Sequence, residues 1–121
     1  MQLTTASRNT AADSLGVLPN SGGKLQFKDS GDVTIVECNM ATDAFGAASS
    51  GVITAGTISQ GTAVAAGTVD KVLCLNSGST EVWRSAVSTS GEDFTLDNLV
   101  FAIGTKLDIS SYTITVPAGT A

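Results

Sequence analysis

Short alternations of apolar and polar side chains recur along the chain, and a period of two residues is typical of β-strands with one buried face. Leu25 and Phe27 alternate with polar neighbours in residues 24–28. Residues 36–40 repeat this alternation after residues 29–32, whose sequence DSGD favours a turn. The pattern therefore predicts two strands joined by a tight turn.

The most regular alternation lies further along the chain. Tyr112, Ile114 and Val116 are separated by single threonines, and Pro117 ends the segment. This spacing predicts a strand whose three large side chains share one buried face.

A hairpin is predicted between these regions. Residues 69–75 are continuously apolar from Val72, as in a strand that is covered on both faces. The sequence NSGS at residues 76–79 favours a hairpin turn, and residues 81–87 are the expected return strand. Shorter strand candidates are residues 52–54, 94–96, 99–103 and 107–109.

One short helix is predicted near the start of the sequence. Ala11, Leu15 and Leu18 are spaced to lie on one helical face. Asn9 is the candidate N-cap, and Gly16 together with Pro19 is expected to end the helix. A helix of this length is marginal in water unless it packs against the sheet.

Together these elements predict an all-β fold: an antiparallel β-sandwich of jelly-roll or immunoglobulin-like topology with at most one short N-terminal helix. The length of 121 residues corresponds to one domain. We expect a single β domain over residues 1–121, with a short N-terminal arm at residues 1–7 and a C-terminal tail at residues 117–121.

The composition indicates a surface with little charge. Only 14% of the residues are charged, the net charge is -5 and the pI is about 4.3. A negative chain is a poor ligand for nucleic-acid phosphates, so no nucleic-acid partner is expected. The longest apolar run, residues 99–103, is far shorter than a membrane span, and the first residues lack the pattern of a signal peptide. We therefore expect no membrane partner.

Few residues could support catalysis or bind a metal. The chain contains no histidine, which removes the commonest general base and the commonest metal ligand. Cys38 and Cys74 lie within apolar strand segments, and we interpret them as buried thiols. The alternative is a disulfide between neighbouring strands.

One acidic group, Glu92, Asp93 and Asp97, is a further candidate site. We interpret it as an exposed turn and strand edge, since Asp and Glu are rarely buried. The alternatives are the carboxylate pair of a glycosidase and a weak calcium site, which lacks the ordered spacing of an EF-hand. We therefore predict that the chain is not an enzyme and needs no cofactor or metal.

Three segments together resemble a group of small virion proteins of tailed bacteriophages that are rich in Ala, Gly and Thr. They are residues 45–52 (FGAASSGV), 89–96 (TSGEDFTL) and 111–119 (SYTITVPAG), with Arg8 and Asn9 near the start. The resemblance spans most of the chain in order. It implies a structural component of the virion, such as a capsid decoration (cement) protein, a head fibre or a tail component, without catalytic residues.

The first functional hypothesis is therefore a non-enzymatic phage structural protein that binds junctions between coat subunits, with the major capsid protein or other virion subunits as partner. A homotrimer or another homo-oligomer is expected, and the expected location is the virion. The alternatives are a tail, fibre or baseplate component, and a carbohydrate-binding adhesin module. Trp83 is either a partly buried core residue or an interface anchor. The candidate partner-binding residues are Met1, Gln2, Leu3, Phe45 and Trp83.

Overall fold

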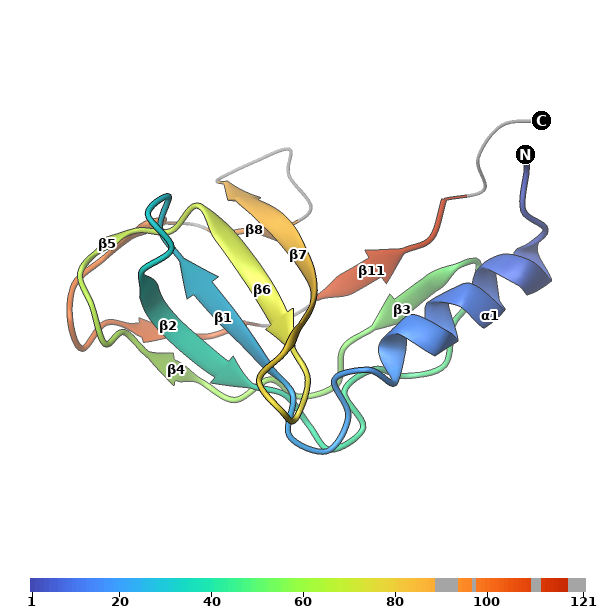
Figure 1. Cartoon of the computed structure of the whole chain (residues 1–121), viewed down its shortest axis with the longest axis horizontal. Helices are drawn as coiled ribbons and strands as arrows, with labels where there is room; N and C mark the ends of the chain where they lie inside the picture. The colour runs from blue at the N-terminus through green and yellow to red at the C-terminus, as the bar shows by residue number, and fades with distance from the viewer. Residues whose placement is uncertain (89–93, 97, 110–111, 118–121) are drawn as a thin grey trace.

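The computed structural model describes residues 1–88, 94–96, 98–109 and 112–117. These residues form a β-rich body and an arm, made of one helix and a two-stranded ribbon, that projects from the body (Figure 1). The elements are α1 (Thr5–Gly16), β1 (Lys24–Lys28), β2 (Thr34–Asn39), β3 (Val52–Thr54), β4 (Gly61–Thr62), β5 (Gly67–Thr68), β6 (Lys71–Leu75), β7 (Glu81–Ser88), β8 (Phe94–Thr95), β9 (Val100–Phe101), β10 (Lys106–Leu107) and β11 (Thr113–Thr115).

The body is built around a five-stranded sheet with the order β2-β1-β6-β7-β8. The predicted turns join its antiparallel neighbours: Asp29 accepts hydrogen bonds from the backbone of Gly31 and Val33, and Asn76 does the same for Gly78 and Thr80. The β7–β8 pair is the exception, since these two strands run parallel. The prediction of a mainly antiparallel β fold with one short helix is confirmed.

Burial along the central strands follows the sequence pattern. Leu25 and Phe27 of β1 are fully buried, and their polar neighbours are only half-buried. In β6 the four residues from Val72 to Leu75 are all buried, which confirms the prediction of a strand covered on both faces. On the outer face, Leu73 lies in register between Gln26 and Arg84 and is 8% exposed.

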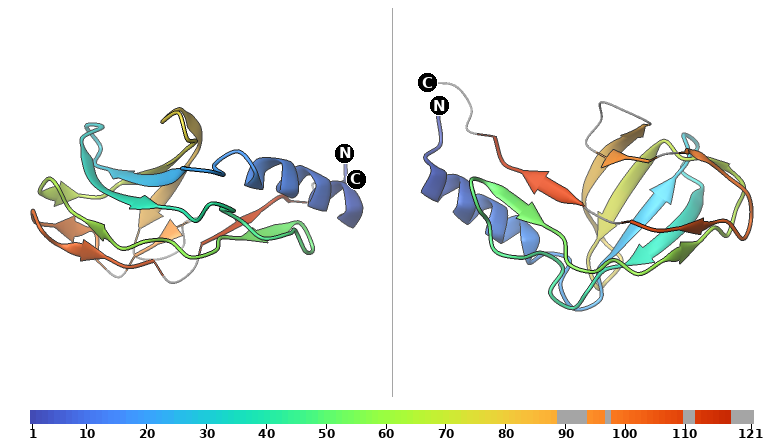
Figure 2. Two further views of the ribbon diagram at one scale, coloured as in Figure 1. Left: turned by 90° about the horizontal axis from the view of Figure 1, so that it is seen from below. Right: turned by 180° about the vertical axis from the view of Figure 1, so that it is seen from behind.

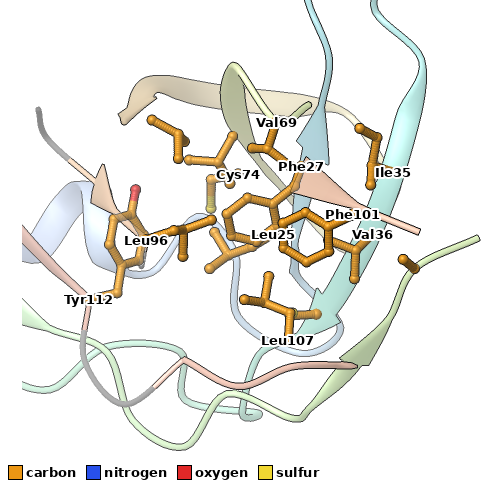
Figure 3. Packing of buried hydrophobic residues seen from close by; sticks show 14 of the residues in the cluster. Leu25, Phe27, Ile35, Val36, Val69, Cys74, Leu96, Phe101, Leu107 and Tyr112 are labelled. Carbon is orange, nitrogen blue, oxygen red and sulfur yellow. The ribbon is translucent and has the colours of Figure 1, made fainter. Parts of the chain in front are cut away.

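The main core lies between this sheet and the short pairs β4–β10 and β5–β9 (Figures 2 and 3). Its sheet side is made by β1, β2, β6 and β7, and its other side by residues such as Phe101 of β9 and Leu107 of β10. The labelled side chains in Figure 3 converge on Phe27 from both sides. The buried cluster comprises Leu25, Phe27, Ile35, Val36, Cys38, Met40, Ala44, Ala63, Val69, Val72, Cys74, Val87, Leu96, Phe101, Leu107 and Tyr112.

The helix begins earlier than its sequence pattern predicts. Asn9 is not the N-cap: α1 starts at Thr5, and the side chain of Thr4 caps it by accepting a hydrogen bond from the Ser7 backbone N–H at 3.1 Å. Residues 5–7 of the predicted arm are thus the first helical turn. Gly16 is the last helical residue, so Leu18, which the pattern places on the apolar helical face, lies outside the helix and is 45% exposed.

Two predicted strand faces differ from the structure. Ile103 does not continue the buried alternation of residues 99–103: it lies in a turn and is 73% exposed. Tyr112, Ile114 and Val116 do point to one side, but only Tyr112 is fully buried, since the other two lie in the thin arm. Local alternation identifies a face without specifying how much protein covers it.

Gly61 provides a test of the packing between β4 and the sheet. A Cβ at this position would lie 2.5 Å from the Glu37 carbonyl oxygen and 2.7 Å from Val36 Cγ2, so the backbone would have to move. We expect Gly61→Ala to lower the free energy of unfolding by about 1–3 kcal/mol, as overpacking does. Denaturant unfolding measures this change.

Gly56→Ala is the matched control. Its Cβ would meet the Asp43 carbonyl oxygen at 3.6 Å, an ordinary contact, so the expected change is within about 0.5 kcal/mol. Equal stability of the two variants would contradict the close approach of β4 to β2.

Candidate functional site

The arm places α1 across a two-stranded ribbon made by β3 and β11 (Figures 1 and 2). Ile53 of β3 and Ile114 of β11 are directly opposed and therefore share one face. The helix approaches this face through small residues: Ala12 and Gly16 are buried, and a Cβ on Gly16 would lie 3.2 Å from Ile53 Cδ1. The opposite face of the ribbon is left uncovered by α1.

Polar side chains fix the helix to the ribbon. Arg8 Nε donates to the Val116 carbonyl at 2.9 Å, and Asn9 Oδ1 accepts from the Gly51 backbone N–H at 2.8 Å. One turn later, Asp13 Oδ1 accepts from the Ala48 backbone N–H at 2.7 Å. These bonds satisfy backbone groups of the ribbon and its loop, which have no strand partner there.

An aromatic cluster joins the arm to the body. The ring of Phe45 lies 5.9 Å from that of Trp83 on β7 and 6.0 Å from that of Tyr112, which precedes β11, both in tilted geometry. Trp83 Nε1 donates a hydrogen bond to the Tyr112 hydroxyl at 3.1 Å, and the Ser85 hydroxyl lies 3.5 Å from the same oxygen. We call Phe45, Trp83 and Tyr112 the aromatic junction.

The candidate partner-binding residues separate into two groups. Met1 and Gln2 are exposed and Leu3 is half-buried, at the end of α1 away from the body. Phe45 and Trp83 are half-buried against the core within the aromatic junction, so Trp83 is a partly buried core residue. The structure therefore brings the last two together and leaves the first three at a distant position.

The sequence analysis did not identify Arg8, Asn9 and Asp13 as residues that hold the arm together. One feature of the sequence could have indicated this role. Arg8, Asn9 and Asp13 carry guanidinium, amide and carboxylate side chains within a segment otherwise rich in alanine, serine and threonine. A second signal is charge: residues 44–69 and 109–121 contain no charged residue, and the two strands of the ribbon come from these segments.

Charged residues gather on the outer face of the large sheet instead. The strand register places Lys24, Lys28, Lys71 and Arg84 on this face. Lys71 pairs with Asp32 and lowers the pKa of that carboxyl, mainly through their hydrogen bond.

Two further pairs neutralise this face. Arg84 binds both carboxylate oxygens of Glu81 at 2.6 and 2.7 Å, which lowers the pKa of Glu81 and raises that of Arg84. Lys24 lies 3.5 Å from Glu37. Three of the four cations on this face are therefore paired with carboxylates, and Lys28 Nζ donates to the Asp32 backbone carbonyl at 3.3 Å.

The two cysteines are free thiols that cannot reach each other. Cys38 of β2 and Cys74 of β6 both lie opposite Leu25 of the intervening strand β1. Two strand spacings separate them by about 10 Å, beyond the Cα separation of a disulfide. Burial raises the pKa of Cys38 to about 11 and that of Cys74 to about 12. The alternative of a disulfide between neighbouring strands is therefore wrong.

The remaining chemical candidates yield no described site. Glu92, Asp93 and Asp97 lie outside the described residues, and within the described ranges no three His, Cys, Asp or Glu side chains converge as metal ligands. No described helix has the length and apolar character needed to cross a membrane. A shallow groove on α1 is lined by Ala6, Ser7, Thr10 and Ala11.

Comparisons with protein-family models, curated proteins and solved structures found no match.

The hydrogen bond within the aromatic junction can be measured by a double-mutant cycle. Trp83→Phe and Tyr112→Phe each remove one partner of the bond between Nε1 and the phenol oxygen. We expect a coupling free energy of about 1 kcal/mol between them, the usual net value of a hydrogen bond. Denaturant unfolding of the four proteins gives this value, and additive effects would show that the bond contributes nothing.

The buried thiols predict a loss of stability at high pH. Their folded-state pKa values are raised above the ordinary value of 9.0, so their contribution is complete below pH 9 and is lost as the pH rises toward 11 and 12. Over that range each thiol lowers the free energy of unfolding by about 1.4 kcal/mol per pH unit. Cys38→Ala and Cys74→Ala should each flatten the decline, and a slope unchanged by both substitutions would contradict this.

Proposed function

We propose that the chain is a non-enzymatic structural protein of a bacteriophage virion, and specifically a capsid decoration protein that binds at junctions between coat subunits. The observation that carries the proposal is the division into a packed body and a projecting arm whose ribbon strands contain no charge. A body seated on one subunit would leave the arm free to reach the next. The phage resemblance of residues 45–52 and 111–119 adds to this, since both segments contribute to the arm.

The surface chemistry of the arm suits contacts between proteins. Thr54, Thr113 and Thr115 are exposed on the face of the ribbon that α1 does not cover. Such uncharged side chains lose little free energy on desolvation and little rotamer entropy on ordering. Repetition on a symmetric shell then supplies avidity, so each contact can be weak.

The architecture of the body is part of the proposal. The large sheet and the pairs β4–β10 and β5–β9 on the other side of the core are the two layers of a β-sandwich. In this arrangement the ion pairs on the outer face of the large sheet and the exposed Val64, Val100 and Ile103 lie on the body, away from the arm. The arm would therefore be the part that contacts neighbouring coat subunits.

Purified particles provide the test. Heads and tails of the phage that encodes the chain are separated, and the chain is quantified in each fraction by mass spectrometry. We expect it on heads, in a fixed ratio to the major capsid protein. Recovery with tails alone would establish the tail alternative, and absence from both fractions would refute a structural role.

A deletion then tests the candidate partner-binding residues of the arm. Removing residues 1–3 takes away the β-bridge of Gln2 but keeps Thr4, the cap of α1, so the thermal unfolding midpoint should fall by at most a few degrees. Binding to decoration-free heads should fall at least several-fold, because Met1 is 92% exposed and Leu3 is half-buried at the tip of the arm. The control is Ile103→Ser, which removes exposed apolar surface from the body and should bind as the wild type does. Equal binding by the deletion and the control would exclude these residues from the interface.

A further inference from the structure

One edge of the arm ribbon is unpaired among the described residues. The bonds from Ala55 N–H to the Tyr112 carbonyl and from Val116 N–H to the Gly51 carbonyl, both 2.8 Å, fix which backbone groups of β11 face β3. They belong to every second residue, so the N–H and C=O groups of Thr113 and Thr115 point to the opposite edge. No described segment runs along that edge (Figures 1 and 2).

Apart from its length of three residues, this edge carries none of the features by which proteins prevent strand pairing. Edge strands are normally protected by lysine, by inward-pointing charges, by bulges or by proline within the strand. β11 has the sequence Thr-Ile-Thr in regular register with β3, and Pro117 comes only after it. Threonine and isoleucine are also among the residues that favour strands.

The distribution of charge favours a second copy of the chain as the occupant. Two molecules with a net charge of -5 repel each other over most approaches. Residues 109–121 are free of charge, and so are residues 44–69, which include β3. The β11 edge is therefore a place where two copies meet without bringing like charges into contact.

We propose that β11 strands of two copies pair antiparallel about a two-fold axis that passes beside Ile114. The two ribbons then form one four-stranded sheet in the order β3-β11-β11-β3, with both α1 helices on the same face. The proposal concerns self-association alone and does not rest on the proposed function.

The register of this pairing follows from the groups that face outward. Thr113 of each copy lies opposite Thr115 of the other, and the two pairs exchange four backbone hydrogen bonds. The Ile114 side chains, each half-buried in one copy, meet across the axis as a non-hydrogen-bonded pair with Cα atoms about 4.5 Å apart. A shift of two residues toward the end of β11 would place Pro117 opposite Thr113, and proline has no N–H to donate.

Charge substitutions test both the pairing and its register. In Thr113→Lys/Thr115→Lys the opposed residues are both cationic, whereas in Thr113→Lys/Thr115→Glu they are oppositely charged. The first variant has a net charge of -3 (-5 plus two lysines), and the second keeps -5. If only the net charges of the two molecules mattered, the dilysine variant would therefore associate more readily than the Lys/Glu variant. Pairing of the β11 strands predicts the opposite, because it brings the introduced lysines of the two copies together.

Sedimentation over a range of protein concentrations gives the masses. We expect the wild type and the Lys/Glu variant to rise toward twice the chain mass of 12.1 kDa, and the dilysine variant to stay at the chain mass. A wild-type chain that is monomeric at every concentration, or a dilysine variant that still dimerises, would overturn the proposal.

Cysteine cross-linking places the axis. Ile114→Cys should give a covalent dimer when a mild oxidant removes two electrons and two protons from the paired thiols, whereas Thr113→Cys, which faces Thr115 of the other copy, should not. Cys38 and Cys74 are fully buried and serve as the internal background in both proteins. Equal cross-linking of the two variants, or none in Ile114→Cys while sedimentation shows a dimer, would overturn this register.

Discussion

The hydrogen bond between the Trp83 indole and the Tyr112 hydroxyl, with Phe45 against both rings, is the contact on which the position of the arm depends. Tyr112 is the last core residue before β11, so its anchorage fixes the direction in which that strand leaves the body. Phe45 performs the same task for the loop that leads to β3. Both strands of the ribbon are therefore oriented by side chains buried at one junction.

Beyond this junction, hydrogen bonds add to a narrow apolar contact in which Ala12 and Gly16 pack against the ribbon. The helix is attached by Arg8, Asn9 and Asp13 to backbone groups, because a thin ribbon cannot bury a wide apolar stripe. Charged side chains are otherwise concentrated in pairs on the outer face of the large sheet. The arm thus has a neutral hydroxyl-rich face and a neutral strand edge.

These two surfaces have separate roles in the proposals. Attachment to a coat subunit would use the tip of the arm and the threonine face, whereas self-association would use the backbone of β11. A two-fold pair joins two arms and leaves both bodies at the outside. Such a pair doubles the number of attachment points, so even weak contacts with a shell would become effective through avidity.

The sequence by itself determined the local periods: the buried face of β1 at Leu25 and Phe27, the two-sided burial of β6, and the hairpin turn at Asn76. Each is encoded by residues adjacent in the chain, where strand geometry alone assigns a side chain to a face. Contacts between distant segments were decided only by the tertiary structure. It separated Cys38 from Cys74 by placing β1 between them. It also assembled the aromatic junction and docked α1 through Ala12 and Gly16 instead of the expected face of Ala11, Leu15 and Leu18. Strand order and helix docking depend on pairings that alternation does not encode.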